Sequence, residues 1–198
     1  MIFSFTGAQS TGKTTLLEHL KCTNLGSPSF EFIPEVTRLV KREYEVPINE
    51  DGDDMTQMLI MTEHIRNIFK GRTDNLIRGV NKILDRCALD GIVYSHYLLD
   101  KGKISRTTYD ACDLIYKKLR KEYDVIFYTS PDDVKLVNDG ERSVDKYFRE
   151  DIIGLFDMYL QYNIIEDGPR VVCLEGSVKE RLETIKSTLE SYNVDIKI

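Results

Sequence analysis

The sequence predicts a doubly wound α/β fold, in which helices cover both faces of a parallel sheet of five strands. Two observations lead to this prediction. Five short apolar runs alternate with amphipathic segments of helical length, and a glycine-rich turn joins the first run to the first helical segment. Strands that alternate with helices form parallel sheets, because each helix crosses over and returns the chain to the starting edge. Such folds bind ligands at the carboxyl ends of their strands, so functional residues are expected there.

The expected strands are short and comprise residues 2–5, 30–33, 80–84, 125–128 and 171–174. Helices are expected where apolar residues recur every three or four positions, near residues 13–21, 36–44, 54–69, 89–99, 107–121, 148–163 and 178–191. Capping boxes mark the starts of two helices: Thr107 with Asp110 is a weak variant, and Ser177 with Glu180 is a full one. We expect a single domain that spans residues 1–198.

The composition is that of a globular protein without a polyanionic partner. Hydrophobic residues make up 41% of the chain and charged residues 30%, which is enough for a buried core. The net charge of −6 and the isoelectric point of about 5.2 repel polyanions at long range, which argues against a general nucleic-acid binder. This charge balance is compatible with a local cationic pocket for phosphates.

Cysteine usage and the lack of targeting signals predict a cytoplasmic location. The four cysteines have no Cys-x-x-Cys spacing, which favours reduced thiols over a disulfide framework or a metal site: Cys22, Cys87, Cys112 and Cys173. The first residues lack the cationic and apolar regions of a secretory signal, and no apolar run is long enough to cross a bilayer. We expect no membrane partner.

The glycine-rich turn after the first strand matches the phosphate-binding pattern G-x-x-x-x-G-K-[ST] in full. Its glycines let the backbone wrap around phosphate oxygens, while successive amide N–H groups and the helix N-terminus supply a fixed positive field. In this pattern Lys13 reaches the β- and γ-phosphates and the hydroxyl of Thr14 ligates Mg²⁺. The alternative is a chance match in a turn rich in Gly, Ser and Thr, and the flanking strand and helix argue against it. The residues expected to bind ATP are Gly7, Ala8, Gln9, Ser10, Thr11, Gly12, Lys13, Thr14 and Thr15.

Charged residues also follow the second and third strands. Glu35 begins the helix after the second strand, where a carboxylate can orient or deprotonate an attacking hydroxyl. Arg38, one turn later, can hold a substrate phosphate or carboxylate. After the third strand, Asp85 can bind the water shell of Mg²⁺ and Arg86 can face the acceptor or the transferred phosphoryl group. The structural alternatives are a helix-dipole acid at the first position and a cap with a surface ion pair at the second.

A polar segment between the fourth and fifth strands is a candidate lid. It covers about residues 138–149 and contains Arg142 and Arg149, whose guanidinium groups can neutralise charge on the transferred phosphoryl group. The alternative is a solvated loop that leads into a basic helix start. Arg72 and Arg78 flank another polar stretch, and only their position suggests contact with substrate.

Four segments occur in the order found in a known group of kinases: FTGAQSTGKT at 5–14, PEVTR at 34–38, DR at 85–86 and NDGER at 138–142. Through them the chain resembles the AAA-type P-loop kinases related to the nicotinamide-riboside kinase domain of NAD-biosynthesis regulators. More distantly it is similar to deoxynucleoside and thymidylate kinases. The resemblance spans nearly the whole chain, to the segment around residues 174–182.

The resemblance implies a P-loop kinase fold with an arginine-bearing lid. It matches Glu35 to the acceptor-side carboxylate, Asp85 and Arg86 to the acidic-arginine pair, and Arg142 and Arg149 to the lid arginines. The chain departs from these relatives after residue 86, where a cysteine stands in place of the Ser or Tyr of deoxynucleoside and thymidylate kinases. It also lacks the arginine that directly precedes the glutamate in thymidylate kinases.

Three functions are compatible with these residues. The first is an ATP- and Mg²⁺-dependent kinase that phosphorylates a nucleoside, a nucleotide or a related small molecule, with Lys13, Arg142 and Arg149 on the phosphoryl group. The second is a regulatory ATPase or switch in which ATP orders the lid for a partner. The third is a kinase acting on a nucleic-acid end or a modified base, which the acidic composition disfavours. A GTPase is disfavoured because residues 129–132 read TSPD where a guanine-reading Asn-Lys-x-Asp would stand. A homodimer is a candidate assembly.

Overall fold

The computed structural model describes residues 1–24, 27, 29–70, 78–131, 146–165 and 168–198, with the backbone alone at 146 and 163–165. Five strands form one sheet in the order β2-β3-β1-β4-β5, and all four pairings are parallel. The chain thus places two strands on one side of β1 and two on the other, which confirms the doubly wound prediction. The strands are β1 (Ile2–Thr6), β2 (Phe30–Ile33), β3 (Asn81–Asp85), β4 (Val125–Thr129) and β5 (Arg170–Leu174).

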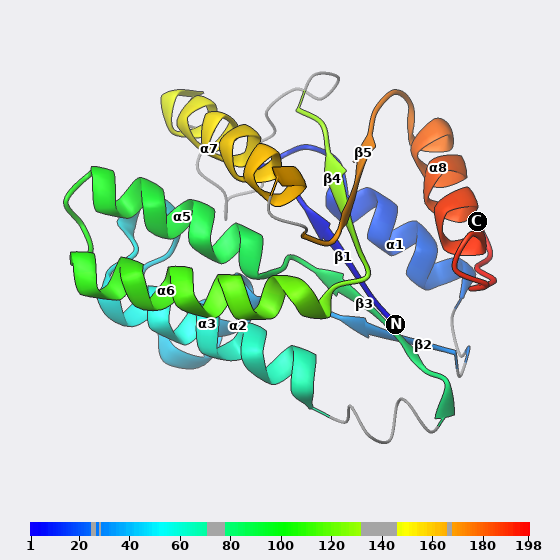
Figure 1. Ribbon diagram of the computed structural model, residues 1–198, viewed down its shortest axis with the longest axis horizontal. Helices are drawn as coiled ribbons and strands as arrows, with labels where there is room; N and C mark the ends of the chain where they lie inside the picture. Colours follow the sequence, from blue (N-terminus) through cyan, green and yellow to red (C-terminus); the bar gives the residue numbers. More distant parts are fainter. Residues whose placement is uncertain (25–26, 28, 71–77, 132–145, 166–167) are drawn as a thin grey trace.

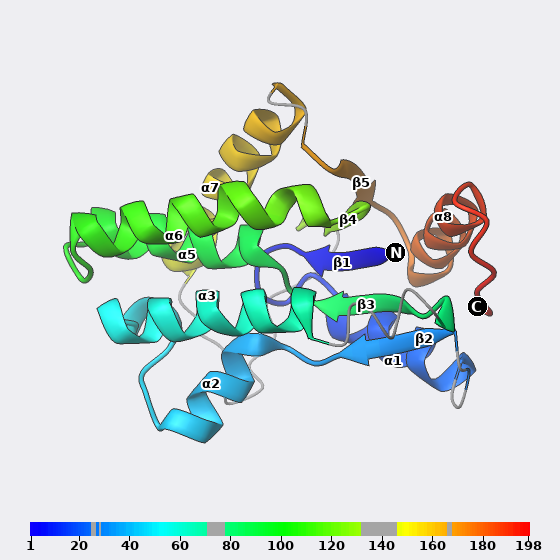
Figure 2. The same ribbon diagram turned by 60° about the horizontal axis from the view of Figure 1, so that its bottom comes forward.

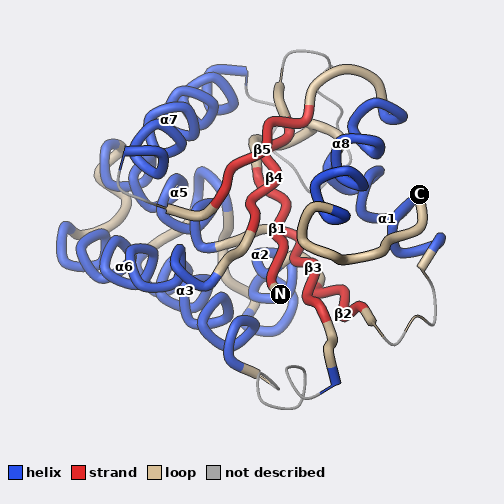
Figure 3. The backbone as a smooth tube through the Cα atoms, turned by 45° about the vertical axis from the view of Figure 1, so that its right-hand side comes forward, coloured by secondary structure: helices blue, strands red, loops and turns tan. Residues whose placement is uncertain are grey.

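Side chains of the central strands alternate between two cores, one on each face of the sheet. Phe3, Phe5 and Phe127 belong to the core on the face covered by two helices, and Leu84 and Ile126 belong to the core on the opposite face. Figure 1 and Figure 3 show this layering, with the sheet between the two groups of helices. The first face carries α1 (Lys13–Thr23) and α8 (Val178–Glu190), and the second carries α3 (Asp54–Phe69), α5 (Ala88–Asp100), α6 (Arg106–Leu119) and α7 (Lys146–Ile165).

The carboxyl ends of the first three strands point to the same edge of the sheet (Figure 2). There, α2 (Val36–Tyr44) starts shortly after β2 ends and packs on α3 through Val36, Val40 and Ile60. Strand β3 ends one residue later than expected, so that Asp85 is its last residue. The glycine-rich turn, the start of α2 and the end of β3 therefore meet at one edge.

The helix starts test the two predicted capping boxes. The box at Ser177 is present: its hydroxyl accepts from the Glu180 amide at 3.4 Å, and the glutamate carboxylate accepts from the Ser177 amide at 2.8 Å. The prediction at Thr107 is wrong, because Ser105 has the extended backbone of an N-cap and accepts from the Thr108 amide at 3.2 Å. Two short 3₁₀ turns complete the element list, η1 (Asn49–Asp51) and η2 (Arg120–Glu122). Among the described residues, no helix has both the length and the apolar character needed to span a membrane.

Candidate functional site

The glycine-rich turn joins β1 to α1 in a conformation that only glycine adopts without strain. Gly7 has φ = 133° and Gly12 has φ = 87°, both in the left-handed half of the backbone map. A Cβ atom at Gly7 would lie 2.6 Å from the Oγ1 atom of Thr129 at the end of β4. The tight turn brings the start of α1 to the sheet edge, where its amide N–H groups can face an anion.

Lys13 is buried and folds back over this turn. Its ammonium group donates to the carbonyl oxygens of Gly7 and Ala8 at 2.8 and 2.6 Å and to the Thr11 hydroxyl at 3.1 Å. Burial, and then the charge of Arg86, lower the pKa of Lys13 well below its usual value. Within the described part of the chain no carboxylate lies at ion-pair distance from it, so its charge can be neutralised by a phosphate.

A set of buried polar contacts holds the turn from behind. The hydroxyls of Thr11 and Thr129 lie 2.6 Å apart, and Thr129 donates to the Thr6 carbonyl at 3.0 Å. Arg181 of α8 is buried and donates from NH1 to the Thr11 carbonyl at 2.8 Å and from Nε to the Gly176 carbonyl at 2.9 Å. Sequence reasoning missed this arginine, because nothing local links it to a turn 170 residues earlier.

Arg86 connects the turn to the two neighbouring strand ends. Its NH1 atom donates to the Gly7 carbonyl and to an Asp90 carboxylate oxygen, each at 2.7 Å. Its Nε atom lies 3.4 Å from the Glu35 carboxylate. Burial opposes its charge, but Glu35 and Asp90 together raise the pKa of Arg86 well above its usual value. Arg86 is only 7% exposed, so the surface ion pair considered as an alternative does not describe it.

The backbone of Arg86 is held in a strained conformation. Its φ of 82° is in the left-handed region, which side chains other than glycine adopt at a cost of about 1–3 kcal/mol. Asp90 stabilises this bend from α5: its second oxygen accepts from the Thr6 hydroxyl at 2.8 Å and from the Cys87 amide at 3.0 Å. Asp90 was missed in the sequence, because Arg86 precedes α5 in a bend and helical spacing therefore does not relate the two side chains.

Asp85 and Thr14, the predicted metal pair, line one cavity of about 310 Å³ together with Glu35. Burial, and then the charge of Glu35, raise the pKa of Asp85 to about 6. No cluster of three or more His, Cys, Asp or Glu side chains suited to a metal is found in the described ranges. Mg²⁺ bound with phosphates needs only one or two protein ligands, and a hydroxyl with a carboxylate fits that donor set.

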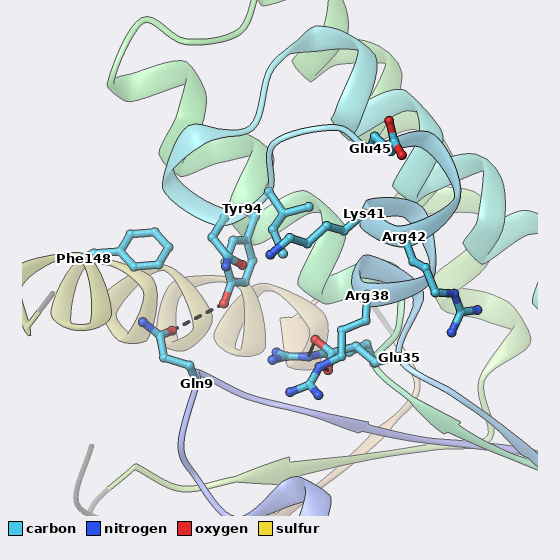
Figure 4. A pocket seen from close by; sticks show the side chains of 11 residues that line it. Gln9, Glu35, Arg38, Lys41, Arg42, Glu45, Tyr94 and Phe148 are labelled. Atoms are coloured by element: carbon cyan, nitrogen blue, oxygen red, sulfur yellow. Dashed lines mark hydrogen bonds and ion pairs between the residues drawn. The ribbon is translucent and has the colours of Figure 1, made fainter. Parts of the chain in front are cut away.

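A larger cavity of about 490 Å³ opens between the turn and α2 (Figure 4). Glu35 lies in its wall and pairs with Arg38 at 2.9 Å as well as with Arg86. The Tyr94 hydroxyl donates to the Gln9 side-chain oxygen at 3.5 Å, so the turn itself forms part of the wall. The lining residues are Gln9, Glu35, Arg38, Lys41, Arg42, Glu45, Ile48, Asn49, Arg86, Tyr94 and Phe148.

The predicted lid is described only at its end. Arg142 lies outside the described residues, as does Arg72. Arg149 is in α7 and donates to the Gln9 carbonyl at 3.3 Å and to the Pro131 carbonyl at 3.4 Å, which places it beside the glycine-rich turn. Helix α7 begins at Lys146, two residues before the expected start. Arg78 is exposed and lines neither cavity.

The comparisons with known proteins agree with this geometry. A family model described as "AAA domain" matches residues 2–181. The chain belongs to this family. A search of curated proteins finds no significant match.

Three similar solved structures extend the comparison to the fold. NadR in complex with NR has a TM-score of 0.70 at 18% identity and is matched over 100% of this chain and 53% of that one. NadR in complex with NAD and AMP-PNP has a TM-score of 0.68 at 16% identity, and the match covers 100% of this chain and 51% of that one. Deoxyadenosine kinase from M. mycoides, with products dCMP and a flexible dCDP bound, has a TM-score of 0.65 at 16% identity, and the match covers 96% of this chain and 100% of that one.

At these identities the likeness shows the fold, and the chain spans about half the length of the NadR structures. The expected resemblance to P-loop kinases related to NadR is confirmed. The fold is the nucleotide-binding α/β fold of that group.

Proposed function

We propose that the protein is an ATP- and Mg²⁺-dependent kinase that transfers the γ-phosphate to a small nucleoside or nucleotide acceptor. The observation that carries the proposal is the position of Glu35. Its carboxylate, fixed by Arg38 and Arg86, lies in the wall of a 490 Å³ cavity that the phosphate-binding turn also lines through Gln9. A donor held by the turn and an acceptor in this cavity would meet at Glu35.

The residues divide into donor and acceptor groups. Lys13 and the backbone of the turn would hold the triphosphate, with Arg149 beside them and Arg142 as a further lid arginine. Thr14 and Asp85 would hold Mg²⁺, which neutralises charge on the phosphates when it is bound. Phosphoryl transfer requires mainly positioning and charge stabilisation, and Lys13 and Arg149, which are held at the turn, would contribute to both.

On the acceptor side, Glu35 would orient the attacking group and Arg38 would contact the acceptor directly. Arg86 would hold Glu35 at a fixed position relative to the turn, since it contacts both the Glu35 carboxylate and the Gly7 carbonyl. The aromatic side chains of Tyr94 and Phe148, whose ring centroids lie 6.0 Å apart, offer an apolar wall for a base.

The test is ADP formation from ATP with a panel of nucleosides and nucleotides. Glu35→Gln should largely keep ATP binding, because Lys13 and the backbone of the turn hold the phosphates, and it should lose about 100-fold or more in turnover. Lys13→Ala should lose ATP binding. Glu43→Gln, on the exposed side of α2 and outside the cavity, is the matched control and should behave as the unmodified protein. Slow ATP hydrolysis that no acceptor stimulates would contradict the proposal and favour a nucleotide-dependent switch.

A further inference from the structure

The wall of the 490 Å³ cavity carries a surplus of positive charge. Four of its lining side chains are basic and two are acidic, whereas the whole chain has a net charge of −6. Acidic residues therefore dominate the rest of the protein and basic residues dominate this one cavity. Such local reversal of sign attracts and orients an anionic ligand.

Two of the four basic side chains already have carboxylate partners. Arg38 pairs with Glu35 at 2.9 Å, and Arg86 pairs with Glu35 at 3.4 Å and with Asp90 at 2.7 Å. Lys41 and Arg42 differ: among the described residues, no carboxylate lies within 4.0 Å of either. The surplus charge therefore belongs to these two residues of α2.

The two differ in direction. Figure 4 shows the Lys41 side chain extending across the cavity toward Tyr94, whereas Arg42 points to the other side of α2. Lys41 lies three residues after Arg38, so the two side chains leave α2 on neighbouring positions of one face. A ligand in the cavity would therefore meet Lys41 and Arg38 together.

Helix position alone gives a competing account of Lys41. It lies in the last turn of α2, where a cation stabilises the helix through the helix dipole. That account predicts an effect on stability and none on the choice of ligand. The experiment below separates the two accounts.

We propose that the acceptor is a nucleoside monophosphate whose phosphate is held by Lys41 and Arg38. The inference rests on the proposed kinase function and narrows its substrate class. A neutral nucleoside offers the exposed Lys41 ammonium group no ionic partner, whereas a phosphate dianion does. The volume of about 490 Å³ lies in the range of cavities that hold ligands of this size.

This acceptor also changes the chemistry required of Glu35. A phosphate monoester loses its second proton near about pH 6, so at neutral pH the attacking oxygen is already ionised. The new bond joins this oxygen to the γ-phosphorus, the bond between the γ-phosphorus and the bridging oxygen breaks, and ADP leaves with that electron pair. No proton has to be removed, which suits a carboxylate that is held between two arginines.

The experiment measures binding and turnover separately for each nucleoside and its 5′-monophosphate. Calorimetry is done with the donor site saturated by AMP-PNP and Mg²⁺, so that the acceptor reports on the second cavity alone. The monophosphate should bind about tenfold or more tightly than its nucleoside, the size expected for a hydrogen bond between charged groups. Lys41→Gln should reduce that preference severalfold, since Arg38 remains, and leave nucleoside binding unchanged.

Lys118→Gln is the matched control. Lys118 is an exposed lysine in the last turn of α6 and lines neither cavity, so the substitution removes the same helix-dipole contribution without touching the site. Its acceptor binding should equal that of the unmodified protein. Thermal unfolding of both variants should show similar small losses.

Several outcomes would overturn the inference: equal binding of nucleoside and monophosphate, equal weakening of both by Lys41→Gln, or binding of neither. The kinase proposal is tested separately through ADP formation. Phosphorylation of a nucleoside without any preference for the monophosphate would leave the kinase function standing and remove the inference. If the protein preferred the monophosphate through Lys41 but transferred no phosphate to it, the kinase function would be removed and the phosphate-binding role of Lys41 would stand.

Discussion

Replacing Asp85 by asparagine should stabilise the protein at neutral pH when no metal or nucleotide is bound. Burial and the charge of Glu35 raise the pKa of this carboxyl from 3.8 to about 6 in the folded state. Each pKa unit corresponds to about 1.36 kcal/mol, so the ionised carboxylate disfavours folding by about 3 kcal/mol above pH 6. Asparagine has nearly the same shape and does not ionise, and it avoids this loss.

The sign of the pH dependence follows from proton counting. Between about pH 4 and pH 6 the folded protein holds the Asp85 proton while the unfolded chain has lost it, so the contribution of this group to stability falls as pH rises through that window. The increase in the free energy of unfolding caused by Asp85→Asn should therefore be absent at pH 4 and reach about 3 kcal/mol at pH 7.5. Burial lowers the pKa of His64 to about 4, which gives an opposite pH trend, but His64 is present in both proteins and cancels from the difference.

The assay is urea unfolding of the unmodified protein and the variant at four pH values between 4 and 7.5, in EDTA and without nucleotide. Asp54→Asn is a control of opposite sign. A hydrogen bond from the Ser105 amide lowers the pKa of Asp54 below 3.8, so this substitution should cost stability by nearly the same amount at all four pH values, because that contribution is lost only at lower pH. A stability difference for Asp85→Asn that does not change with pH would refute the electrostatic reasoning.

Three further substitutions test the contacts around the turn. Gly7→Ala should destabilise the protein by about 2 kcal/mol and abolish ATP binding, because the new methyl group would lie 2.6 Å from a threonine hydroxyl of β4. A free energy of unfolding in urea close to that of the unmodified protein would contradict this. Asp90→Asn should cost about 3 kcal/mol in the same assay, because Arg86 stays buried with one carboxylate partner fewer, and a loss below about 1 kcal/mol would show that the pair is dispensable. Arg181→Met should weaken ATP binding by about tenfold, because Arg181 donates to the Thr11 carbonyl of the turn. Lys179→Met, at an exposed site on the same helix, should leave ATP binding unchanged. Equal effects of the two substitutions on ATP binding would exclude a specific role of Arg181 in holding the turn.

Periodicity and motif spacing predicted most of the fold for identifiable physical reasons. Strands that are buried on both faces have to be apolar throughout, and helices that cover a sheet have to carry one apolar stripe, so both leave a pattern in the sequence. The glycine-rich turn leaves a pattern in the sequence as well, because its glycines are needed at φ = 133° and φ = 87°. The error at Thr107 arose because three neighbouring hydroxyl residues can all cap a helix, and only the backbone angles select Ser105.

The contacts of the candidate site were less predictable, because they join residues that are far apart in the chain. Arg181 reaches the turn from α8, and Lys41 faces the cavity only because α2 packs on α3. Sequence spacing placed Glu35 and Arg86 at strand ends but could not show that they pair with each other across 51 positions. Asp90 is close to Arg86 in the chain, but Arg86 precedes α5 with a φ of 82°, so helical spacing alone could not identify their contact.

In the proposed kinase, Arg86 would make the donor and acceptor halves of the site depend on each other. It contacts the Gly7 carbonyl on the donor side and the Glu35 carboxylate on the acceptor side, and Asp90 holds its strained backbone in place. An acceptor phosphate that drew Arg38 away from Glu35 would leave Arg86 as the main partner of that carboxylate. A tighter pair between Arg86 and Glu35 would alter the hydrogen bond from Arg86 to the Gly7 carbonyl at the base of the turn.

Acceptor binding and ATP binding should therefore be energetically coupled. Because coupling free energies are reciprocal, each ligand must change the affinity for the other by the same factor, whichever binds first. Asp90→Asn, which loosens Arg86 without touching either ligand, should reduce that factor toward one in calorimetric titrations made in both orders, and an unchanged factor would show that the two halves communicate by another route.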